Sequence, residues 1–200
     1  MSEANYNVDR DLAEAKALAE HLVPYIYEDQ IYGSIGGMFG SGSMPSLTIG
    51  GLLLRLDRLH ALESQMNDAQ KAQLAAIDAQ HENARKEWTV HYNNKLAAEA
   101  SSRLKMIQQY LRDCKEDPKS CAYNYTPEAN RRTVVEALVK AMQRHNVTPD
   151  DLSTTIRSVD AGLRGFTKPG DFMLSDTLKP AYPQDKYWWL YVRPLLVEKK

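Results

Sequence analysis

The fold is decided by residues 46–114, which read SLTIGGLLLRLDRLHALESQMNDAQKAQLAAIDAQHENARKEWTVHYNNKLAAEASSRLKMIQQYLRDC. This stretch contains no proline, and its only glycines, Gly50 and Gly51, stand near its beginning. It is rich in Leu, Ala, Gln, Lys and Glu, which all favour helices. We therefore expect a long central helix, or a broken helix pair, on which shorter elements pack.

A break in this stretch is predicted near residues 65–67. One unbroken helix to Cys114 would be about 100 Å long at 1.5 Å per residue, which is unusual for a small domain. Asn67-Asp68-Ala69-Gln70 has the pattern of a capping box, with Asn67 as the cap and Gln70 at the third helical position. We expect a second helix over residues 68–114, long enough to protrude.

The segment before the central stretch predicts a first helix and a loop. Apolar residues recur at helical spacing from residue 9 to about 32, and Pro24 should kink or divide that helix. Residues 33–45 form a glycine-rich loop. Such a loop before a helix can cradle a phosphate, but the Walker lysine is missing and no strand precedes it. A plain connector is the competing interpretation.

The segment after the central stretch predicts a helical hairpin over residues 127–165 and an extended wrap over residues 166–200. Thr126-Pro127 and Thr148-Pro149 are typical helix starts, and Gly165 is a candidate C-cap. The wrap contains four prolines and a cluster of large aromatic residues. We expect that cluster to belong to the core, because it is too apolar to remain in water. All these elements fit one helical domain over residues 1–200.

Composition and charge exclude several classes of protein. The chain is 43% hydrophobic and 26% charged, with a net charge of −1. No apolar run approaches the ~20 residues of a membrane span, and the polar, acidic N-terminal residues do not resemble a targeting peptide. We therefore expect a cytoplasmic protein without membrane contact, in which Cys114 and Cys121 are free thiols.

Two Asp-x-x-His pairs are the candidates for a metal site. They are Asp57/His60 and Asp78/His81, and a carboxylate and a histidine three residues apart on a helix can share an ion. Along one helix the two pairs would stand about 31 Å apart, so they could meet only if the chain folds back. We assign no catalytic, cofactor-binding or metal-binding residue and expect no cofactor.

The C-terminal half offers candidate nucleic-acid contacts. Residues 1–100 carry 8 basic and 14 acidic side chains, whereas residues 101–200 carry 17 and 12. Positive charge gathers on the first helix of the predicted hairpin, at Arg131, Arg132, Lys140 and Arg144. These residues could contact phosphates while the tail's aromatic rings stack on bases. Interleaved glutamates weaken this interpretation.

Self-association is predicted for the alanine-rich part of the central stretch. Its few large apolar residues, together with one alanine, mark a single helix face, namely Leu74, Ile77, Ala84 and Trp88. Such a face cannot stabilise an isolated helix, so a partner helix in the same chain or in another must cover it. An antiparallel homodimer is the simplest arrangement that meets this need.

The sequence thus predicts an all-α protein, an irregular helical bundle with a C-terminal wrap. Its most consistent function is that of a non-enzymatic interaction or scaffold protein that forms a homo-oligomer or binds another protein. A nucleic-acid-binding protein is the first alternative. A protein that binds a metal or a phosphate ligand, through the Asp/His pairs or the glycine-rich loop, is the second.

Overall fold

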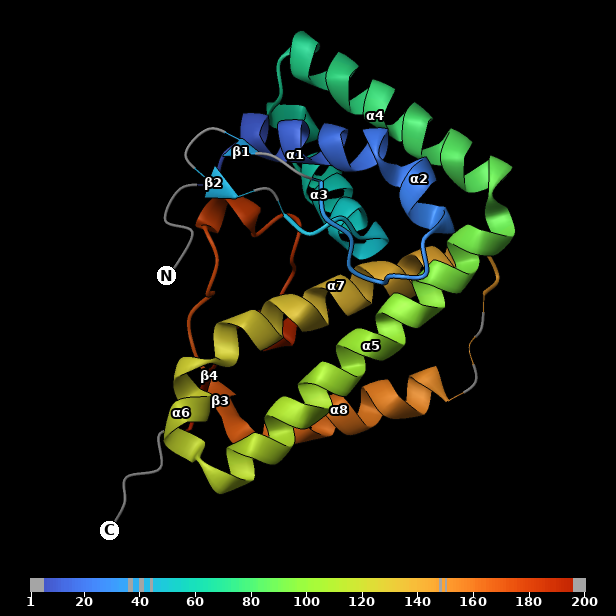
Figure 1. The fold of residues 1–200 in the computed structure, drawn as a ribbon. Coiled ribbons are helices and arrows are strands. Elements are labelled where there is room, and N and C mark those ends of the chain that lie inside the picture. The colour runs from blue at the N-terminus through green and yellow to red at the C-terminus, as the bar shows by residue number, and fades with distance from the viewer. Residues whose placement is uncertain are drawn as a thin grey trace. The chain divides into compact units, whose positions relative to one another are not determined.

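Eight α-helices make up most of the part of the chain that the structure describes (Figure 1). The structure is a computed structural model that describes residues 6–35, 38–39, 42–43, 45–147, 149 and 151–195. The helices are α1 (Val8–Glu20), α2 (Leu22–Tyr27), α3 (Ile49–Ala61), α4 (Asp68–Glu87), α5 (Thr89–Glu116), α6 (Pro118–Tyr123), α7 (Tyr125–Arg144) and α8 (Leu152–Phe166). The predicted all-α class is confirmed.

Two small antiparallel ladders and three short 3-10 turns complete the described elements. Strand β1 (Met38–Phe39) pairs with β2 (Gly42–Ser43). Strand β3 (Thr167–Pro169) pairs with β4 (Val192–Pro194), so that Lys168 lies opposite Arg193. The turns span Glu63–Gln65, Asp176–Leu178 and Trp188–Leu190.

The predicted break near residues 65–67 is confirmed. Helix α3 ends at Ala61, a 3-10 turn follows, and α4 begins at Asp68. The Asn67 side chain accepts a hydrogen bond from the Gln70 amide at 2.9 Å, and the Gln70 side chain accepts one from the Asn67 amide at 3.0 Å. This capping box satisfies two of the donors that a helix start leaves unpaired.

The prediction of one helix over residues 68–114 is wrong, because the chain leaves the helix at Trp88. Its backbone angles are φ −115° and ψ 36°, and α4 and α5 run in different directions on either side of it (Figure 1). The Trp88 ring packs edge-to-face on Tyr27, with the ring centroids 4.7 Å apart. Thr89 and Val90, which follow, are β-branched and favour a helix interior less than the residues before them.

The first predicted helix is divided, as Pro24 indicated, but the division falls about one turn before the proline. Helix α1 ends at Glu20, and α2 begins at Leu22 after His21. Pro24 has no N–H to donate to the carbonyl of residue 20, and its ring crowds that carbonyl, so the interruption falls there. Near the other end of the chain, Gly165 is not a C-cap: it lies inside α8, and Thr167 caps that helix.

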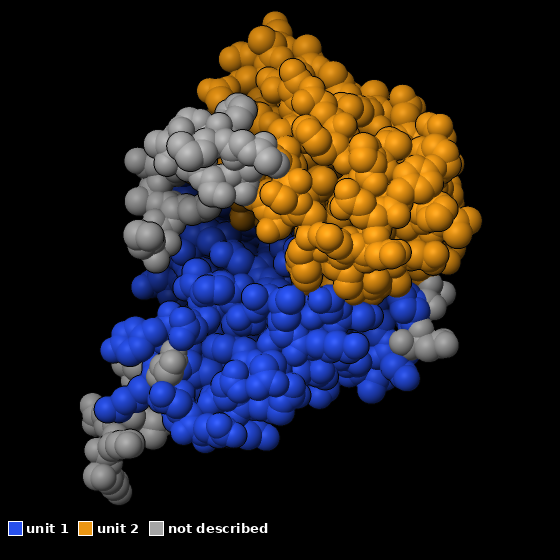
Figure 2. Space-filling view, in the orientation of Figure 1, with its two compact units in different colours: residues 1–6, 100–136, 148–200 blue, residues 7–99, 137–147 orange. Residues whose placement is uncertain are grey.

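The chain divides into two compact units (Figure 2). Unit 1 comprises residues 1–6, 100–136 and 148–200, and unit 2 comprises residues 7–99 and 137–147. In unit 2, α1 packs on α3 and α4 (Figure 1). Its core is formed by aliphatic side chains and tyrosines that are fully buried, among them Leu12, Leu18, Leu22, Tyr25, Ile49, Leu52, Leu59 and Tyr92.

The aromatic tail belongs to the core of unit 1, as predicted. Trp189 is 1% exposed, and its indole N–H donates to the Thr133 hydroxyl at 2.9 Å. The Tyr125 hydroxyl donates to the Trp189 carbonyl, also at 2.9 Å. Tyr182 and Tyr187 are buried and pack ring to ring. Because each buried polar tip has a partner, the aromatic bodies are buried without an unpaired donor or acceptor.

The prediction that Cys114 and Cys121 are free thiols is wrong: they form a disulfide. Helix α5 ends at Glu116 and α6 begins at Pro118, so the chain turns between the two cysteines. The turn brings their Cα atoms to 5.1 Å, which is within the range that a disulfide spans. The Tyr110 hydroxyl donates to the Cys121 carbonyl at 2.9 Å and ties the two helices at the same point.

Within the described ranges, no helix combines the length and the apolarity that a bilayer crossing requires.

Candidate functional site

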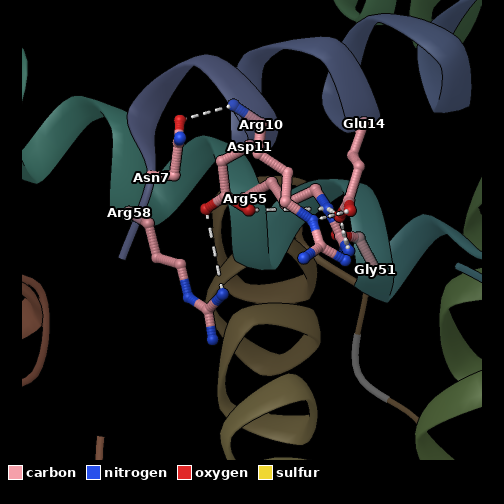
Figure 3. Close-up of polar contacts among 7 residues, drawn as sticks. All are labelled: Asn7, Arg10, Asp11, Glu14, Gly51, Arg55 and Arg58. Atoms are coloured by element: carbon pink, nitrogen blue, oxygen red, sulfur yellow. Dashed lines mark hydrogen bonds and ion pairs between the residues drawn. The ribbon is translucent and has the colours of Figure 1, made fainter. Parts of the chain in front are cut away.

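A cluster of buried charges in unit 2 lies between α1 and α3 (Figure 3). Asp11 and Glu14 stand three residues apart on α1, and Arg55 and Arg58 stand three residues apart on α3. Residues at that spacing share one helix face, so the two pairs meet where the helices pack. Arg55 Nε donates to Glu14 Oε2 at 2.9 Å, and Asp11 lies 3.8 Å from both arginines.

This cluster holds the Glu14 carboxylate in the ionised form. Burial raises the pKa of Glu14, but pairing with Arg10 and Arg55 outweighs burial and leaves that pKa below its ordinary value. Arg10 Nε donates to the same carboxylate at 2.8 Å. A carboxyl group in this state is a poor proton donor at neutral pH, and the arrangement is that of a clamp between two helices.

A second cluster joins α4, α5 and the residue after α7. His81 Nε2 lies 2.7 Å from the Tyr92 hydroxyl, and the rings of Tyr92 and His145 meet edge-to-face. Burial lowers the pKa of His81 to about 4 and raises the pKa of Tyr92, which is 0% exposed. Both groups are therefore neutral near pH 7, and neither has the pKa near 7 that suits acid–base catalysis.

The two predicted Asp/His pairs are divided between different partners. The chain does fold back, and His60 Nε2 lies 3.1 Å from Asp78 Oδ1, which raises the pKa of His60. Asp57, however, pairs with cations of α7, and His81 pairs with Tyr92. Among the described residues there is no group of three or more His, Cys, Asp or Glu side chains arranged to hold a metal ion.

The four predicted nucleic-acid contacts are all paired with carboxylates inside their own units. Arg131 pairs with Glu128, and Arg132 pairs with Asp160 and Glu136. Lys140 and Arg144 both approach Asp57, at 3.4 and 3.9 Å. Arg132 is also 3% exposed and lies 4.1 Å over the Trp189 ring. Positive charge that is matched in this way offers little to a phosphate.

The predicted interface residues lie mostly inside unit 2. Leu74, Ile77 and Ala84 are 2%, 2% and 4% exposed, on the face of α4 that α1 and α2 cover. The partner helices that this face requires are thus in the same chain. Trp88 is only half-buried, and its indole N–H has no hydrogen-bond partner.

A carboxylate of the same unit lies at the N-terminus of α3, the helix that follows the glycine-rich loop. The Gly50 amide, in the first turn of α3, donates to Glu99 Oε2 at 2.9 Å, and Glu99 is 0% exposed. Sequence reasoning missed this residue, because its negative charge at a helix N-terminus becomes visible only after folding. Residues 36–37, 40–41 and 44 of the loop lie outside the described residues, so the phosphate site stays a prediction.

Sequence reasoning also missed a hollow between α5 and α8 in unit 1, which we call the α5–α8 crease. It consists of two adjoining hollows of about 400 and 160 Å³ that share Gln108. Helix α5 lines it with Ser101, Leu104, Lys105, Gln108, Leu111, Arg112 and Lys115. From the other side it is lined by Asp151 and by α8 residues Leu152, Thr155, Ser158, Val159 and Gly162.

Unit 2 carries an exposed aromatic patch, which consists of Val23, Tyr27, Trp88 and His91. Val23 and Tyr27 are one helical turn apart on α2 and are 36% and 48% exposed. The Tyr27 ring contacts the rings of Trp88 and His91, with centroids 4.7 and 5.2 Å away. The patch surrounds the point where α4 gives way to α5.

Comparison of the chain with protein-family models, with curated proteins and with solved structures found no match.

Proposed function

We propose that the chain is a non-enzymatic helical interaction protein that self-associates. The observation that supports this proposal is the exposed aromatic patch of unit 2, where three aromatic rings gather around an α2 face that water still reaches. Exposed apolar patches mark interaction sites, and aromatic side chains are enriched at the centres of interfaces.

The groups that could carry catalysis have other roles in the described residues. Glu14 and Arg132 are held in ion pairs, and His81 is neutral at physiological pH because burial lowers its pKa. The cations proposed for nucleic acid are matched by carboxylates. A protein–protein contact requires none of these groups.

The proposed contact is a symmetric dimer formed by the aromatic patch on two copies of the chain. A patch that lies on a two-fold axis faces itself, so one surface serves both subunits. The α4 face around Leu74 and Ile77 is already covered by α1. Among the described residues of unit 2, the patch is a place where exposed apolar side chains gather with other aromatic rings.

Sedimentation velocity at micromolar concentration tests this proposal. We expect a wild-type dimer and a monomeric Val23→Ser/Tyr27→Ser variant. Val90→Ser is the matched control. Val90 is 69% exposed, and its side chain leaves α5 about 100° around the helix axis from that of His91, so it lies off the patch. A monomeric wild type, or a patch variant that remains dimeric, would contradict self-association through this surface.

The proposed location is cytoplasmic, under one condition. Disulfides in cytoplasmic proteins are usually transient or redox-sensing, whereas those in oxidising compartments persist. The pairing of Cys114 with Cys121 therefore requires that the bond be reversibly reduced if the protein resides in the cytoplasm. Trapping the thiols in intact cells with an alkylating reagent distinguishes the reduced cysteine pair from the disulfide.

A further inference from the structure

The α5–α8 crease has the dimensions of a seat for a helix. Its lining residues on α5 recur at steps of three and four from Ser101 to Lys115, and those on α8 recur in the same way from Leu152 to Gly162. Two helix faces side by side form a valley, and a span of 14 residues at 1.5 Å is about 21 Å long, which corresponds to about four turns of a third helix.

The floor of the crease is apolar and partly open to water. Leu104 and Val159 are buried, whereas Leu111 and Leu152 are only half-buried. Gly162 keeps the two helices close, because a Cβ there would lie 2.6 Å from Leu111 Cδ1. Apolar side chains of a ligand would remove Leu111 and Leu152 from water. A phosphate backbone would leave them exposed.

The rim of the crease carries cations that have no carboxylate partner among the described residues. Lys105, Arg112 and Lys115 are exposed, and the Arg112 guanidinium donates to the side-chain oxygen of Gln109. Asp151, at the start of α8, is the carboxylate of the rim. This contrasts with α7, whose four basic residues named above are all paired.

We propose that the α5–α8 crease binds an acidic amphipathic helix of a partner protein. Leucine-type side chains of that helix cover Leu111 and Leu152, and its flanking carboxylates meet Lys105, Arg112 and Lys115. Helix-in-groove recognition works in this way, and opposite charges along the rim set orientation and specificity. The inference rests on the proposed function as an interaction protein and names the chemistry of one partner.

A displayed library of 18-residue helices tests the inference with the full chain as bait. Each helix has leucines fixed along one face, and its flanking positions are randomised between Glu and Lys. We expect at least tenfold enrichment of Glu at the flanks. The variant Lys105→Glu/Arg112→Glu/Lys115→Glu should reverse the preference toward Lys.

A matched variant separates local charge from net charge. Lys119→Glu/Lys168→Glu/Lys186→Glu changes three exposed cations of the same unit by the same amount, and it should keep the wild-type preference for Glu. If the triple crease variant does not fold, Lys115→Glu alone should still lower the enrichment of Glu. The crease can also be tested by Leu152→Ser, which should weaken a selected peptide at least tenfold in fluorescence anisotropy.

Three outcomes would overturn the inference: no enrichment, enrichment of Lys by the wild type, or an unchanged preference in the crease variant. Binding of a 20-nucleotide dT probe that the crease variant loses, without enrichment of any helix, would assign the rim to nucleic acid instead. A monomeric protein in sedimentation would refute self-association but would not affect the library result, so the two proposals fail separately.

Discussion

At the scale of single residues, two charged side chains inside the units are held by several partners or by a helix N-terminus. Arg132 is 3% exposed and is held by Asp160, Glu136 and the Trp189 ring. Glu99 is 0% exposed and accepts from the first turn of α3. Burying a charge costs free energy, and removing one member of a buried pair leaves the other uncompensated.

Arg132→Met should destabilise unit 1 by about 3–5 kcal/mol, because Asp160 and Glu136 would lose the cation that neutralises them. Arg157→Met is the matched control: Arg157 is exposed on α8 and donates to the Thr154 hydroxyl within its own helix turn, so we expect a change of about 0.5 kcal/mol or less. Urea unfolding of both variants measures the difference. Equal losses would show that the buried pair is not a stabilising contact.

His81 should make the protein less stable in mild acid. Its pKa in the folded chain is about 4 against 6.5 in the unfolded chain. Below pH 6.5 the unfolded chain therefore binds a proton that the folded chain does not accept until pH about 4. At about 1.36 kcal/mol per pH unit, the free energy of unfolding falls by roughly 3 kcal/mol across this window.

His81→Gln keeps a polar side chain beside Tyr92 and removes the titration. We expect its free energy of unfolding to change less than that of the wild type between pH 7 and pH 4.5 in urea titrations. His60 acts in the opposite sense, since its raised pKa contributes stability at low pH that is lost as the pH rises through that value. A variant that loses as much stability as the wild type would rule out His81 as the cause.

At the scale of elements, helix α4 depends on neighbours from its own chain. Few of its side chains are large and apolar, and α1 and α2 cover the face that carries Leu74 and Ile77. The capping box of Asn67 and Gln70 starts the helix, but packing on α1 stabilises it. The role of this apolar face is therefore to attach α4 to unit 2.

Leu74→Glu/Ile77→Glu should abolish cooperative unfolding rather than yield folded monomers. Both side chains are 2% exposed, so each substitution would bury an unpaired charge and remove core contacts. Ala75→Glu/Ala76→Glu places the same charges at exposed positions of the same helix and should melt within a few degrees of the wild type. Circular dichroism during heating measures both. A folded, monomeric Leu74/Ile77 variant would restore the α4 face as a dimer contact.

At the scale of the whole molecule, the two units carry exposed surfaces of different chemistry. Unit 2 carries the aromatic patch around Tyr27, and unit 1 carries the α5–α8 crease with unpaired cations. Unit 1 also contains the disulfide that joins the end of α5 to α6. Two surfaces of different chemistry suit a protein that meets two kinds of partner.

The protein purified without reductant should contain no free thiols after denaturation, and two after reduction. The reason is that the turn before Pro118 holds the Cα atoms of Cys114 and Cys121 at 5.1 Å, close enough for a disulfide to form in air. Counting thiols with a chromogenic disulfide reagent checks this. Two free thiols before reduction would return the pair to the state that the sequence predicted.

Much of the fold follows from interactions that the sequence shows directly. The helical class, the break before Asp68 and the burial of the aromatic tail were all predicted, and the structure confirms them. Helix propensity and caps involve residues within about four positions of one another, so a reader of the sequence sees both partners at once. The burial of large aromatic side chains can be predicted without knowing which residues they contact, because their exposure to water is unfavourable in itself.

The remaining features depend on contacts between residues that lie far apart in the sequence. The Trp88 ring meets Tyr27, which lies 61 positions earlier in the chain, and Leu74 is covered by α1. The pairing of Lys140 with Asp57 and the unpaired rim of the α5–α8 crease are likewise settled by which helices meet. The pattern of one helix shows which face must be covered, but the covering residues come from distant parts of the chain, and their positions are fixed only when the whole chain packs.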